Sequence, residues 1–458
     1  MTSASGTSLS ALRDRIGGAV LMPGDDGYDH ARAVWNAMVD RKPRVIVRCA
    51  GPDDVAVAVR YAQDAGLEVA VRCGGHSVVG HAVPEDGLMI DLTTMNQVHV
   101  DPARRRARVE GGALLGALDR ASLPHGLATT AGNVSHTGVG GLTLGGGMGW
   151  LARQHGLSCD NVVSFTVVTA DGRNVRASAD QNPELYWGLR GGGGNFGVVT
   201  EFEFQLHPVT GRTFLADLTF SLDDAPGVMR GWRDLIATAP RAATMTAWAG
   251  AQQGEPCAGV GFVWVGDPDD AASLLADLRS LGRPMAEQAH ELHYVDLQRI
   301  DDNIEGHTFR RYWKGHYLRE LSDAAIDAFL MRGAPDGRGE ALPNASLQAY
   351  GGAISDVADA ATAFCHRDTL VEFVAAAKWE DPAEDEARIA AARRYGASLA
   401  PYASGAYVNA LTDEGRAGVQ RAYPPEHLAR LTALKNTWDP DNVFHLNHNI
   451  EPAPRSTP

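Results

Sequence analysis

Two side chains that can act as nucleophiles lie beside glycine-rich backbone. His76 directly follows Gly74 and Gly75, and Cys159 lies near the end of residues 132–161, which include nine glycines. Glycine-rich backbone can approach a flat or phosphorylated ligand closely and offer its N–H groups as donors. An imidazole nitrogen and a thiolate are both nucleophiles. The sequence therefore predicts a ligand surface built mainly of backbone, with a reactive side chain beside each glycine-rich part.

The glycines of residues 132–161 are too dense for a stable helix or an ordinary strand, because each one costs conformational entropy. A flexible linker would explain the glycines but not the apolar residues between them. These are Val139, Leu142, Leu144, Met148, Trp150 and Leu151. We therefore interpret the stretch as an ordered ligand-binding segment.

Short strands and a helix are expected to position the first glycine turn. Residues 45–48 and 68–72 are predicted strands, and residues 52–65 between them are a predicted helix that begins with Pro52 and stops at Gly66. The second strand runs directly into the turn at residues 73–77. A tight Gly-Gly turn after a buried strand presents N–H groups in a concavity that suits a diphosphate.

A further glycine cluster, residues 191–197, contains a formal GxGxxG pattern at Gly192, Gly194 and Gly197. A nicotinamide-binding Rossmann fingerprint requires a strand before these glycines and a helix after them. Here a predicted helix at residues 182–190 comes before the cluster, and a predicted strand at residues 198–206 follows it. This order argues against a Rossmann site.

The glycine density falls between about Phe214 and Tyr402. Predicted strands at residues 214–220, 243–249, 257–265, 346–350 and 370–379 alternate with predicted helices at residues 227–237, 271–281, 324–332 and 385–395. The pattern indicates an antiparallel sheet with helices on one face, a second domain of α+β type. The chain then closes on amides and imidazoles at residues 445–449, which we expect to pack back on a bound cofactor.

The composition argues against several classes of function. The 458 residues are 44% hydrophobic and 21% charged, as in globular proteins of two or three domains. A net charge of -15 argues against a nucleic-acid partner, and no apolar run is long enough to cross a membrane. The polar N-terminus shows no secretory signal, so we expect a cytoplasmic location. Five scattered cysteines without CxxC spacing predict neither disulfides nor a metal site.

The order of the motifs resembles that of the berberine bridge enzyme-like FAD-linked oxidases of the vanillyl-alcohol oxidase superfamily. The segments concerned are residues 72–77 (RCGGHS), 145–149 (GGGMG), 156–161 (GLSCDN), 196–201 (FGVVTE), 407–409 (YVN), 439–444 (DPDNVF) and 447–449 (NHN). The resemblance covers residues 44–450. It implies a PCMH-type FAD-binding domain at residues 1–210, an antiparallel-sheet substrate domain at residues 211–404, and a C-terminal segment at residues 405–458 that returns to the FAD domain.

The resemblance also implies that FAD is attached twice, through His76 to its 8α methyl group and through Cys159 to its C6 carbon. Taken singly, His76 could be an ordinary turn histidine and Cys159 a small buried residue. Cys73 stands where the family usually has a serine. The residues expected to hold the cofactor are Arg72, Cys73, Gly74, Gly75, His76, Ser77, Gly132, Gly138, Gly141, Gly145, Gly147, Gly149, Gly156, Cys159, Asn161, Gly197, Val199, Asn447 and Asn449.

The catalytic residues that the resemblance implies are Tyr407, Glu372 and Gln348. In relatives the tyrosine of the YxN segment often acts as the base, while Glu372 and Gln348 occupy positions that carry acids or tyrosines. An amide cannot act as a base, which favours Tyr407, although Tyr407 could also be a packing aromatic. A free tyrosine has a pKa near 10, so this base would need about 4 kcal/mol of assistance at neutral pH. Residues 313–317 are expected either to line the pocket or to form a surface helix.

The expected reaction is hydride transfer from an alcohol, sugar, amine or natural-product carbon to FAD, with O2 as acceptor giving H2O2. Gly138 matches a family position where a small side chain leaves room for O2. A flavin dehydrogenase with another acceptor and a non-catalytic flavin- or small-molecule-binding protein are the alternatives. The expected partners are a small-molecule substrate and O2, and the expected assembly is a monomer or homodimer.

Overall fold

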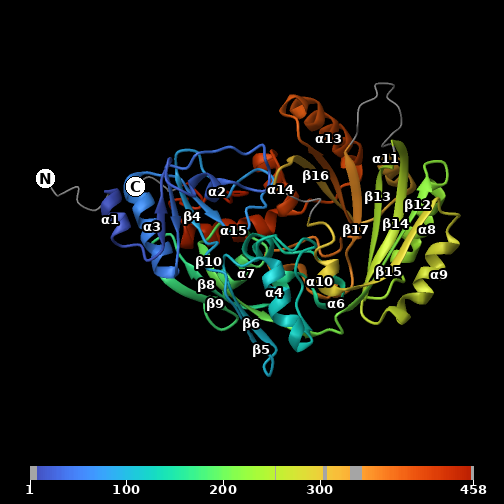
Figure 1. Ribbon diagram of the computed structural model, residues 1–458, viewed down its shortest axis with the longest axis horizontal. Coiled ribbons are helices and arrows are strands. Elements are labelled where there is room, and N and C mark those ends of the chain that lie inside the picture. Colours follow the sequence, from blue (N-terminus) through green and yellow to red (C-terminus); the bar gives the residue numbers. More distant parts are fainter. Residues whose placement is uncertain (1–7, 253, 303–306, 331–342, 455–458) are drawn as a thin grey trace.

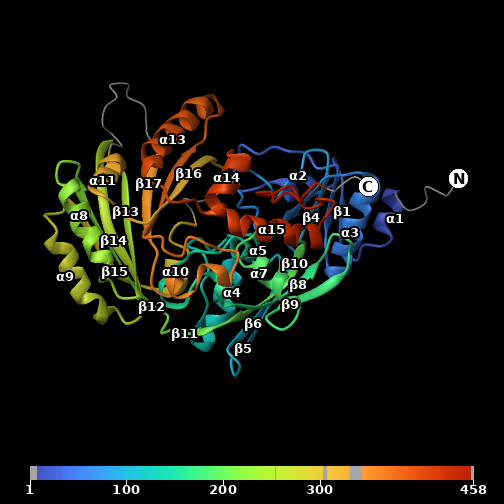
Figure 2. The same cartoon turned by 180° about the vertical axis from the view of Figure 1, so that it is seen from behind.

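The computed structural model describes residues 8–252, 254–302, 307–330 and 343–454. Two regions lie side by side along the long axis (Figure 1), and the reverse view shows the same division (Figure 2). The first region combines the first half of the chain with the C-terminal helices. The second region contains one large sheet with helices on its outer side.

A small, mainly parallel sheet forms one part of the first region. Strands β2 and β3 both run parallel to β4, and β1 pairs antiparallel with β2. The spatial order is β1 (Ala19–Leu21), β2 (Val45–Arg48), β4 (Leu88–Asp91) and β3 (Val69–Arg72). Helix α3 (Pro52–Ala65) connects β2 to β3 and ends at Gly66, whose φ of 63° gives the left-handed cap that glycine adopts readily. The predicted strand–helix–strand unit is confirmed.

A five-stranded antiparallel sheet forms the other part of the first region. Its spatial order is β5 (Val98–Asp101), β6 (Arg106–Glu110), β10 (Val198–Gln205), β8 (Val162–Val168) and β9 (Asn174–Ser178). Helix α4 (Leu115–Ser122) packs near β5, and helix α7 (Pro183–Leu189) packs near β9. The glycine cluster at residues 191–197 lies between α7 and β10, so the predicted order of helix, glycines and strand is correct.

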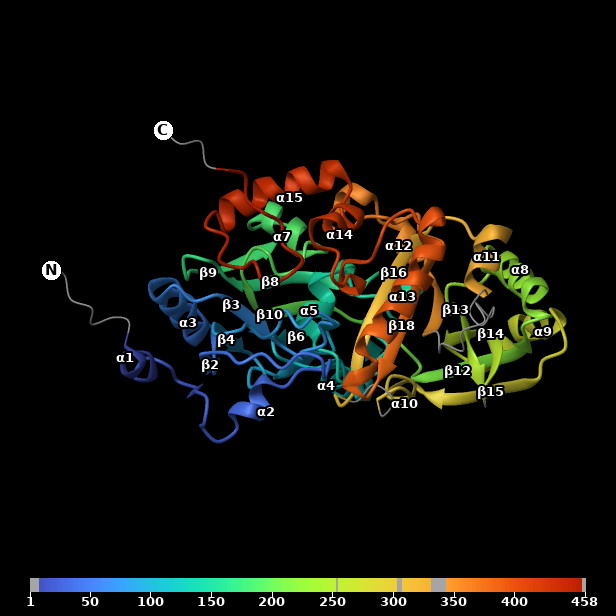
Figure 3. The same ribbon diagram turned by 90° about the horizontal axis from the view of Figure 1, so that it is seen from above.

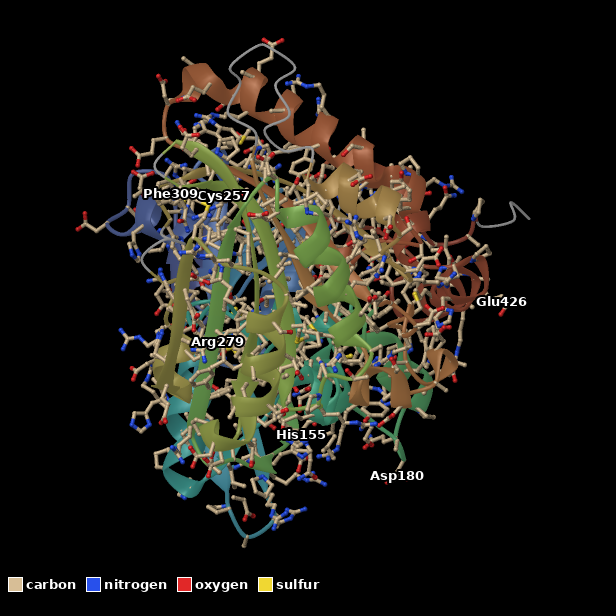
Figure 4. All side chains as sticks on the ribbon, turned by 90° about the vertical axis from the view of Figure 1, so that its right-hand side faces the viewer. His155, Asp180, Cys257, Arg279, Phe309 and Glu426 are labelled. Atoms are coloured by element: carbon tan, nitrogen blue, oxygen red, sulfur yellow. The ribbon has the colours of Figure 1, made fainter. Side chains whose placement is uncertain are left out.

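The second region is a seven-stranded sheet in which all neighbouring strands are antiparallel. Its order is β15 (Ala286–His293), β12 (Arg212–Ser221), β14 (Glu255–Val265), β13 (Ala243–Gln252), β17 (Asn344–Ala349), β18 (Val371–Trp379) and β16 (Arg310–Leu318). One face is covered by α8 (Ala225–Ile236), α9 (Ala272–Ser280), α11 (Asp323–Leu330) and α13 (Asp385–Leu399). Figure 4 shows the molecule from the end that contains this sheet, with Arg279 of α9 labelled. The α+β class is confirmed; the predicted helix at residues 324–332 extends beyond the described residues.

The C-terminal part returns to the first region, where α15 (Pro425–Trp438) lies along α7 (Figure 3). A buried lysine fastens the segment that follows α15. Lys435 Nζ donates to Asp439 Oδ2 at 2.7 Å and to the carbonyl oxygens of Asn195 and Phe444, both at 2.9 Å. These three hydrogen bonds are buried, and together they join the tail to the glycine cluster at residues 191–197.

The remaining elements are short. They are α1 (Leu9–Arg13), α2 (Tyr28–Arg32), α5 (Val139–Leu144), α6 (Ala152–His155), α10 (Tyr294–Leu297), α12 (Ala353–Asp356), α14 (Gly415–Ala422) and the paired strands β7 (Leu127–Ala128) and β11 (His207–Pro208). Within the described ranges, no helix combines the length and apolar character that a membrane span requires.

One expectation about local structure was wrong, one open alternative is decided, and some strands were missed. The long glycine run does contain a helix, α5, because the buried side chains of Val139, Thr143 and Leu144 stabilise it by packing. Residues 313–317 belong to strand β16 and not to a surface helix. Strands β1, β15 and β16 were not predicted, and β15 is a mostly exposed polar edge strand with little apolar alternation to reveal it.

Candidate active site

A cavity of about 600 Å³ lies between the glycine segments of the first region and the uncovered face of the large sheet. Three glycine segments, residues 73–77, 132–141 and 192–197, form one wall together with residues 446–448 of the tail. Side chains of β16, β17 and β18 form the other wall. We call these the glycine wall and the sheet wall.

The glycine wall depends on two loops that touch through their backbones. A Cβ atom added to Gly138 would overlap Cys73 Sγ and the backbone nitrogen of Gly74, and a Cβ on Gly74 would overlap Gly138 in return. In contrast, a Cβ on Gly141 or Gly194 would meet no protein atom within 4 Å. The first pair of glycines therefore allows close packing, while the second pair leaves space for a ligand. The packing against Cys73 gives Gly138 a steric reason to be glycine besides the expected room for O2.

His76 lines the cavity at the end of the turn that follows β3. Its Nε2 atom lies 2.7 Å from His136 Nδ1, and Trp35 stacks on the ring with a centroid distance of 4.9 Å. Thr137 Oγ1 lies 3.4 Å from Nδ1. Burial, and then the neighbouring His136, lower the pKa of His76 well below its ordinary value. The imidazole is therefore neutral and held in one orientation by these contacts.

Cys159 has a different environment from His76. It lies in a short 3₁₀ turn, Ser158–Asn161, is fully buried, and is not among the residues that line the cavity. Its Sγ lies 3.7 Å from Asp160 Oδ1. Burial, followed by the charge of Asp160, raises the pKa of the thiol well above its ordinary value. The sulfur is therefore a protonated thiol packed behind the glycine wall.

Most of the residues predicted to hold the cofactor do meet in the cavity. Those that line it are Cys73, Gly74, Gly75, His76, Ser77, Gly132, Gly138, Gly141, Gly197, Val199 and Asn447. Those that do not are Arg72, Gly145, Gly147, Gly149, Gly156, Cys159, Asn161 and Asn449.

The glycines outside the cavity have packing roles. A Cβ on Gly149 would overlap the carbonyl of Ala131, and one on Gly147 would overlap the Ser158 side chain. Asn161 Nδ2 donates to the carbonyl oxygens of His155 and Leu157. These residues support the glycine wall without lining the cavity. The sequence pattern alone does not distinguish them from the residues that do line it.

The sheet wall carries the predicted catalytic pair. Gln348 on β17 and Glu372 on β18 face each other in register, and both line the cavity. Glu372 is only 7% exposed, and its Oε2 accepts a 2.7 Å hydrogen bond from the hydroxyl of Tyr350. Burial raises the pKa of Glu372 to about 7, although the Tyr350 hydrogen bond opposes this shift. A carboxylate with this pKa is well matched to proton transfer at neutral pH.

Tyr407 also lines the cavity, but its hydroxyl is already used as an acceptor. The oxygen receives the backbone N–H of Gly147 at 2.9 Å and the Nδ2 group of Asn409 at 3.0 Å. Burial, and then the nearby Glu372, raise the pKa of Tyr407 well above its ordinary value. The hydroxyl is therefore better suited to donate its proton than to act as the base.

Several lining residues were missed by the sequence reasoning. Asn133 Nδ2 donates to Gln348 Oε1 at 3.3 Å and so joins the two walls, while Asn409 supports Tyr407. Asn409 was visible as the last residue of the YVN segment, whereas Asn133 carries no recognisable motif. Trp313 belongs to residues 313–317, for which pocket lining was one of two expectations, and of these residues it is the one that lines the cavity.

The donor set and shape of the cavity fit FAD. Glycines with free space before them line one wall, a neutral imidazole lies at one end, and the tail brings Asn447 against the carbonyl of Gly194, with an Nδ2–oxygen distance of 3.3 Å. Asn447 Oδ1 is buried without a hydrogen-bond partner among the described residues, so it can receive a ligand donor.

Comparison with known proteins agrees with this geometry. Residues 43–178 match the family model described as FAD binding domain, and residues 406–451 match the model described as berberine and berberine like. The chain belongs to the berberine bridge enzyme-like FAD-linked oxidoreductases, and it is an FAD-binding enzyme of the oxidase type.

Individual relatives cover almost the whole chain. It is 31% identical to (R)-6-hydroxynicotine oxidase of Paenarthrobacter nicotinovorans, over 95% of this chain and 97% of that protein. The crystal structure of 6-hydroxy-D-nicotine oxidase from Arthrobacter nicotinovorans has a TM-score of 0.86 at 30% identity and covers 95% of this chain and 98% of its own. Glucooligosaccharide oxidase from Acremonium strictum, studied for its 6-S-cysteinyl, 8α-N1-histidyl FAD, has the same fold, with a TM-score of 0.85 at 24% identity over 95% of this chain and 98% of its own.

Proposed function

We propose that the protein is an oxidase that removes a hydride from a small-molecule substrate and uses O2 as the final electron acceptor. The observation that carries the proposal is that the glycine wall and the sheet wall line the same cavity. One cavity joins a glycine wall suited to FAD with a buried carboxylate, Glu372, whose pKa is about 7. Oxidation of a carbon that bears oxygen or nitrogen requires both a hydride acceptor and a base.

Bound FAD supplies the hydride acceptor. Glu372 removes the proton from the substrate heteroatom, and the Tyr350 hydroxyl at 2.7 Å holds the carboxylate in place. Tyr407 is held by Gly147 and Asn409 with its hydroxyl in the cavity, where its remaining proton can be donated to a ligand oxygen or nitrogen. This arrangement supports Glu372 as the base in place of Tyr407, which the sequence favoured.

The test is anaerobic bleaching followed by exposure to air. Alcohols, sugars, amines and polyketide-type compounds are mixed in turn with the yellow protein, and a substrate should remove its visible absorbance. Rapid return of the colour in air with formation of H2O2 supports an oxidase. Slow return in air but fast return with an artificial acceptor would make the protein a dehydrogenase. Absence of bleaching by every class would favour a binding protein.

We further propose a single covalent link to FAD, through His76. His76 lines the cavity as a neutral, oriented imidazole, which supports attachment. The second link expected at Cys159, of the kind named for glucooligosaccharide oxidase, has less support, because the thiol is fully buried, lies outside the cavity wall and has a raised pKa. Only a thiolate that reaches the flavin could add to it.

Acid precipitation of three proteins tests the single link. The parent and Cys159→Ala should keep their yellow colour in the pellet, with the mass of one FAD added to the chain, while His76→Ala should release its flavin. If His76→Ala and Cys159→Ala both keep their flavin in the pellet and only the double variant releases it, the two-link arrangement is correct.

A further inference from the structure

Unlike three other buried acids of the molecule, Glu372 has no cationic partner among the described residues. Asp91 pairs with Arg48 at 3.0 Å, Asp160 with Arg367 at 2.7 Å and Asp439 with Lys435 at 2.7 Å. For Glu372, the structure shows no ion pair within the residues that it describes, and its one side-chain hydrogen bond comes from the neutral Tyr350. An ionised carboxylate removed from water normally has a partner, because its desolvation is costly.

The cavity itself offers no cation to complete the pair. Among the described residues that line it there are two acids, Glu372 and Asp301, and neither lysine nor arginine. Asp119 is also buried without a cation, but it does not line the cavity. Glu372 is therefore a buried acid of the cavity wall that lacks a cationic partner among the described residues. A positively charged ligand can supply that partner.

The surface beside Glu372 suits the apolar part of such a ligand. Along β18 the next residues on the same face, Val374 and Ala376, also line the cavity, and Ala376 pairs with Trp313 on β16. Four residues of a strand span about 13 Å, so the aromatic ring and the carboxylate lie at opposite ends of one face. The small side chains between them leave room for a ring-sized group.

We propose that the substrate is an amine that binds as a cation, with Glu372 as its counter-ion and its apolar part over Val374 and Ala376 toward Trp313. The proposal rests on the oxidase function given above. The substrate N–H proton passes to the Glu372 carboxylate, and a hydride leaves the adjacent carbon for FAD, so that the carbon–nitrogen bond becomes an iminium. Water hydrolyses the iminium to a carbonyl compound and an amine, and O2 takes up the two electrons and two protons as H2O2.

Matched ligands that differ only in charge test the counter-ion. The flavin-loaded protein is titrated with the permanent cation 1,1-dimethyl-2-phenylpyrrolidinium and with the neutral ether 2-phenyltetrahydrofuran, together with smaller and larger ring homologues of each. Binding is followed calorimetrically. In the parent, the best cation should bind at least about tenfold more tightly than its ether, since loss of a buried charge partner typically costs this much or more. Glu372→Gln should remove the difference.

Glu372→Asp serves as the matched control, because it keeps the charge and should keep a preference for the cation. Flavin content and melting temperature are measured for both variants, so that a folding defect is not mistaken for loss of selectivity. Equal affinity for cation and ether in the parent, failure of every cation to bind, or a preference that survives Glu372→Gln overturns the proposal.

Anaerobic mixing with 2-phenylpyrrolidine separates this proposal from the oxidase function. If the cation preference depends on Glu372 but no amine, alcohol or sugar bleaches the flavin, the oxidase function fails and the cation site stands. If neutral alcohols or sugars bleach the flavin, air restores its colour rapidly and amines do not bleach it, the oxidase function stands and the amine proposal fails.

Discussion

The two walls of the cavity recognise their ligands in different ways. The glycine wall has few functional side chains, and its loops approach so closely that Gly74 and Gly138 leave no space for a Cβ atom. The sheet wall has ordinary strands, and its chemistry lies in separate side chains such as Gln348 and Glu372 that register brings face to face. Substitutions that add side-chain atoms should therefore impair the glycine wall. Substitutions that remove charge should impair the sheet wall.

The effect expected to have the widest consequences is at the glycine wall, because an enzyme without flavin cannot carry out any step of the reaction. In Gly138→Val the new side chain would overlap Cys73 Sγ and the Gly74 backbone, which cannot move away as a flexible side chain would. Overpacking typically costs 1 to 3 kcal/mol, so we expect flavin content to fall by about tenfold or more. The measurement is the ratio of flavin absorbance to protein absorbance after purification.

Gly227→Ala is the matched control for this substitution. Gly227 lies on helix α8, where a Cβ would meet no atom within 4 Å, so the variant should keep its flavin and gain slightly in stability. If Gly138→Val binds flavin as the parent does, the two loops are not in fixed contact and the proposed difference between the walls is incorrect.

A more local effect, on the rate of reduction and not on flavin loading, is expected at the sheet wall. Glu372→Gln should keep its flavin but slow anaerobic reduction by about 10² to 10⁴, the usual contribution of a general base. Tyr407→Phe should slow it less, because burial and Glu372 hold the pKa of Tyr407 well above its ordinary value.

The pH profile distinguishes the two residues. The base form of Glu372 is the ionised carboxylate, so the parent's reduction rate should rise with pH through about 7, and this rise should be absent from Glu372→Gln. If Tyr407→Phe lowers the rate of flavin reduction and Glu372→Gln keeps the parent's rate, the sequence-based choice of Tyr407 is correct.

The sequence predicted the glycine wall better than the sheet wall for a physical reason. The Gly-Gly turn before His76 and the glycine run around Gly138 are short local patterns that predict close backbone approach. Both line the cavity. The α+β class followed from local patterns as well. Cys159 shows the limit of this reasoning, because the motif does not predict how deeply the thiol is buried, and the second link to FAD stays a prediction.

The sheet wall was harder to predict because its chemistry arises from distant contacts. The raised pKa of Tyr407 depends on burial and then on Glu372, and the raised pKa of Glu372 depends on burial in the folded protein. Neither effect has a local sequence signal. The domain boundaries at residues 210 and 404, the cytoplasmic location and the oligomeric state stay predictions.

The smallest expected effect lies at the contact between the two regions. Asp119 on α4 is almost fully buried, and its Oδ2 accepts a 3.2 Å hydrogen bond from Gln298, which follows α10. Its Oδ1 has no hydrogen-bond partner among the described residues. Burial raises the pKa of Asp119 to about 7, although the Gln298 hydrogen bond opposes the shift.

A carboxyl group whose pKa is raised on folding stabilises the native state at low pH. This contribution is complete below the unfolded value of 3.8 and is lost as the pH rises to about 7, at a slope of about 1.4 kcal/mol per pH unit. Asp119→Asn keeps the shape but cannot ionise. The melting temperature of the variant relative to the parent should therefore increase between pH 5 and 7 and stay constant above about pH 7. A difference that does not change with pH would mean that Asp119 is ionised in the folded protein throughout this range, and that the contact between the two regions tolerates its charge.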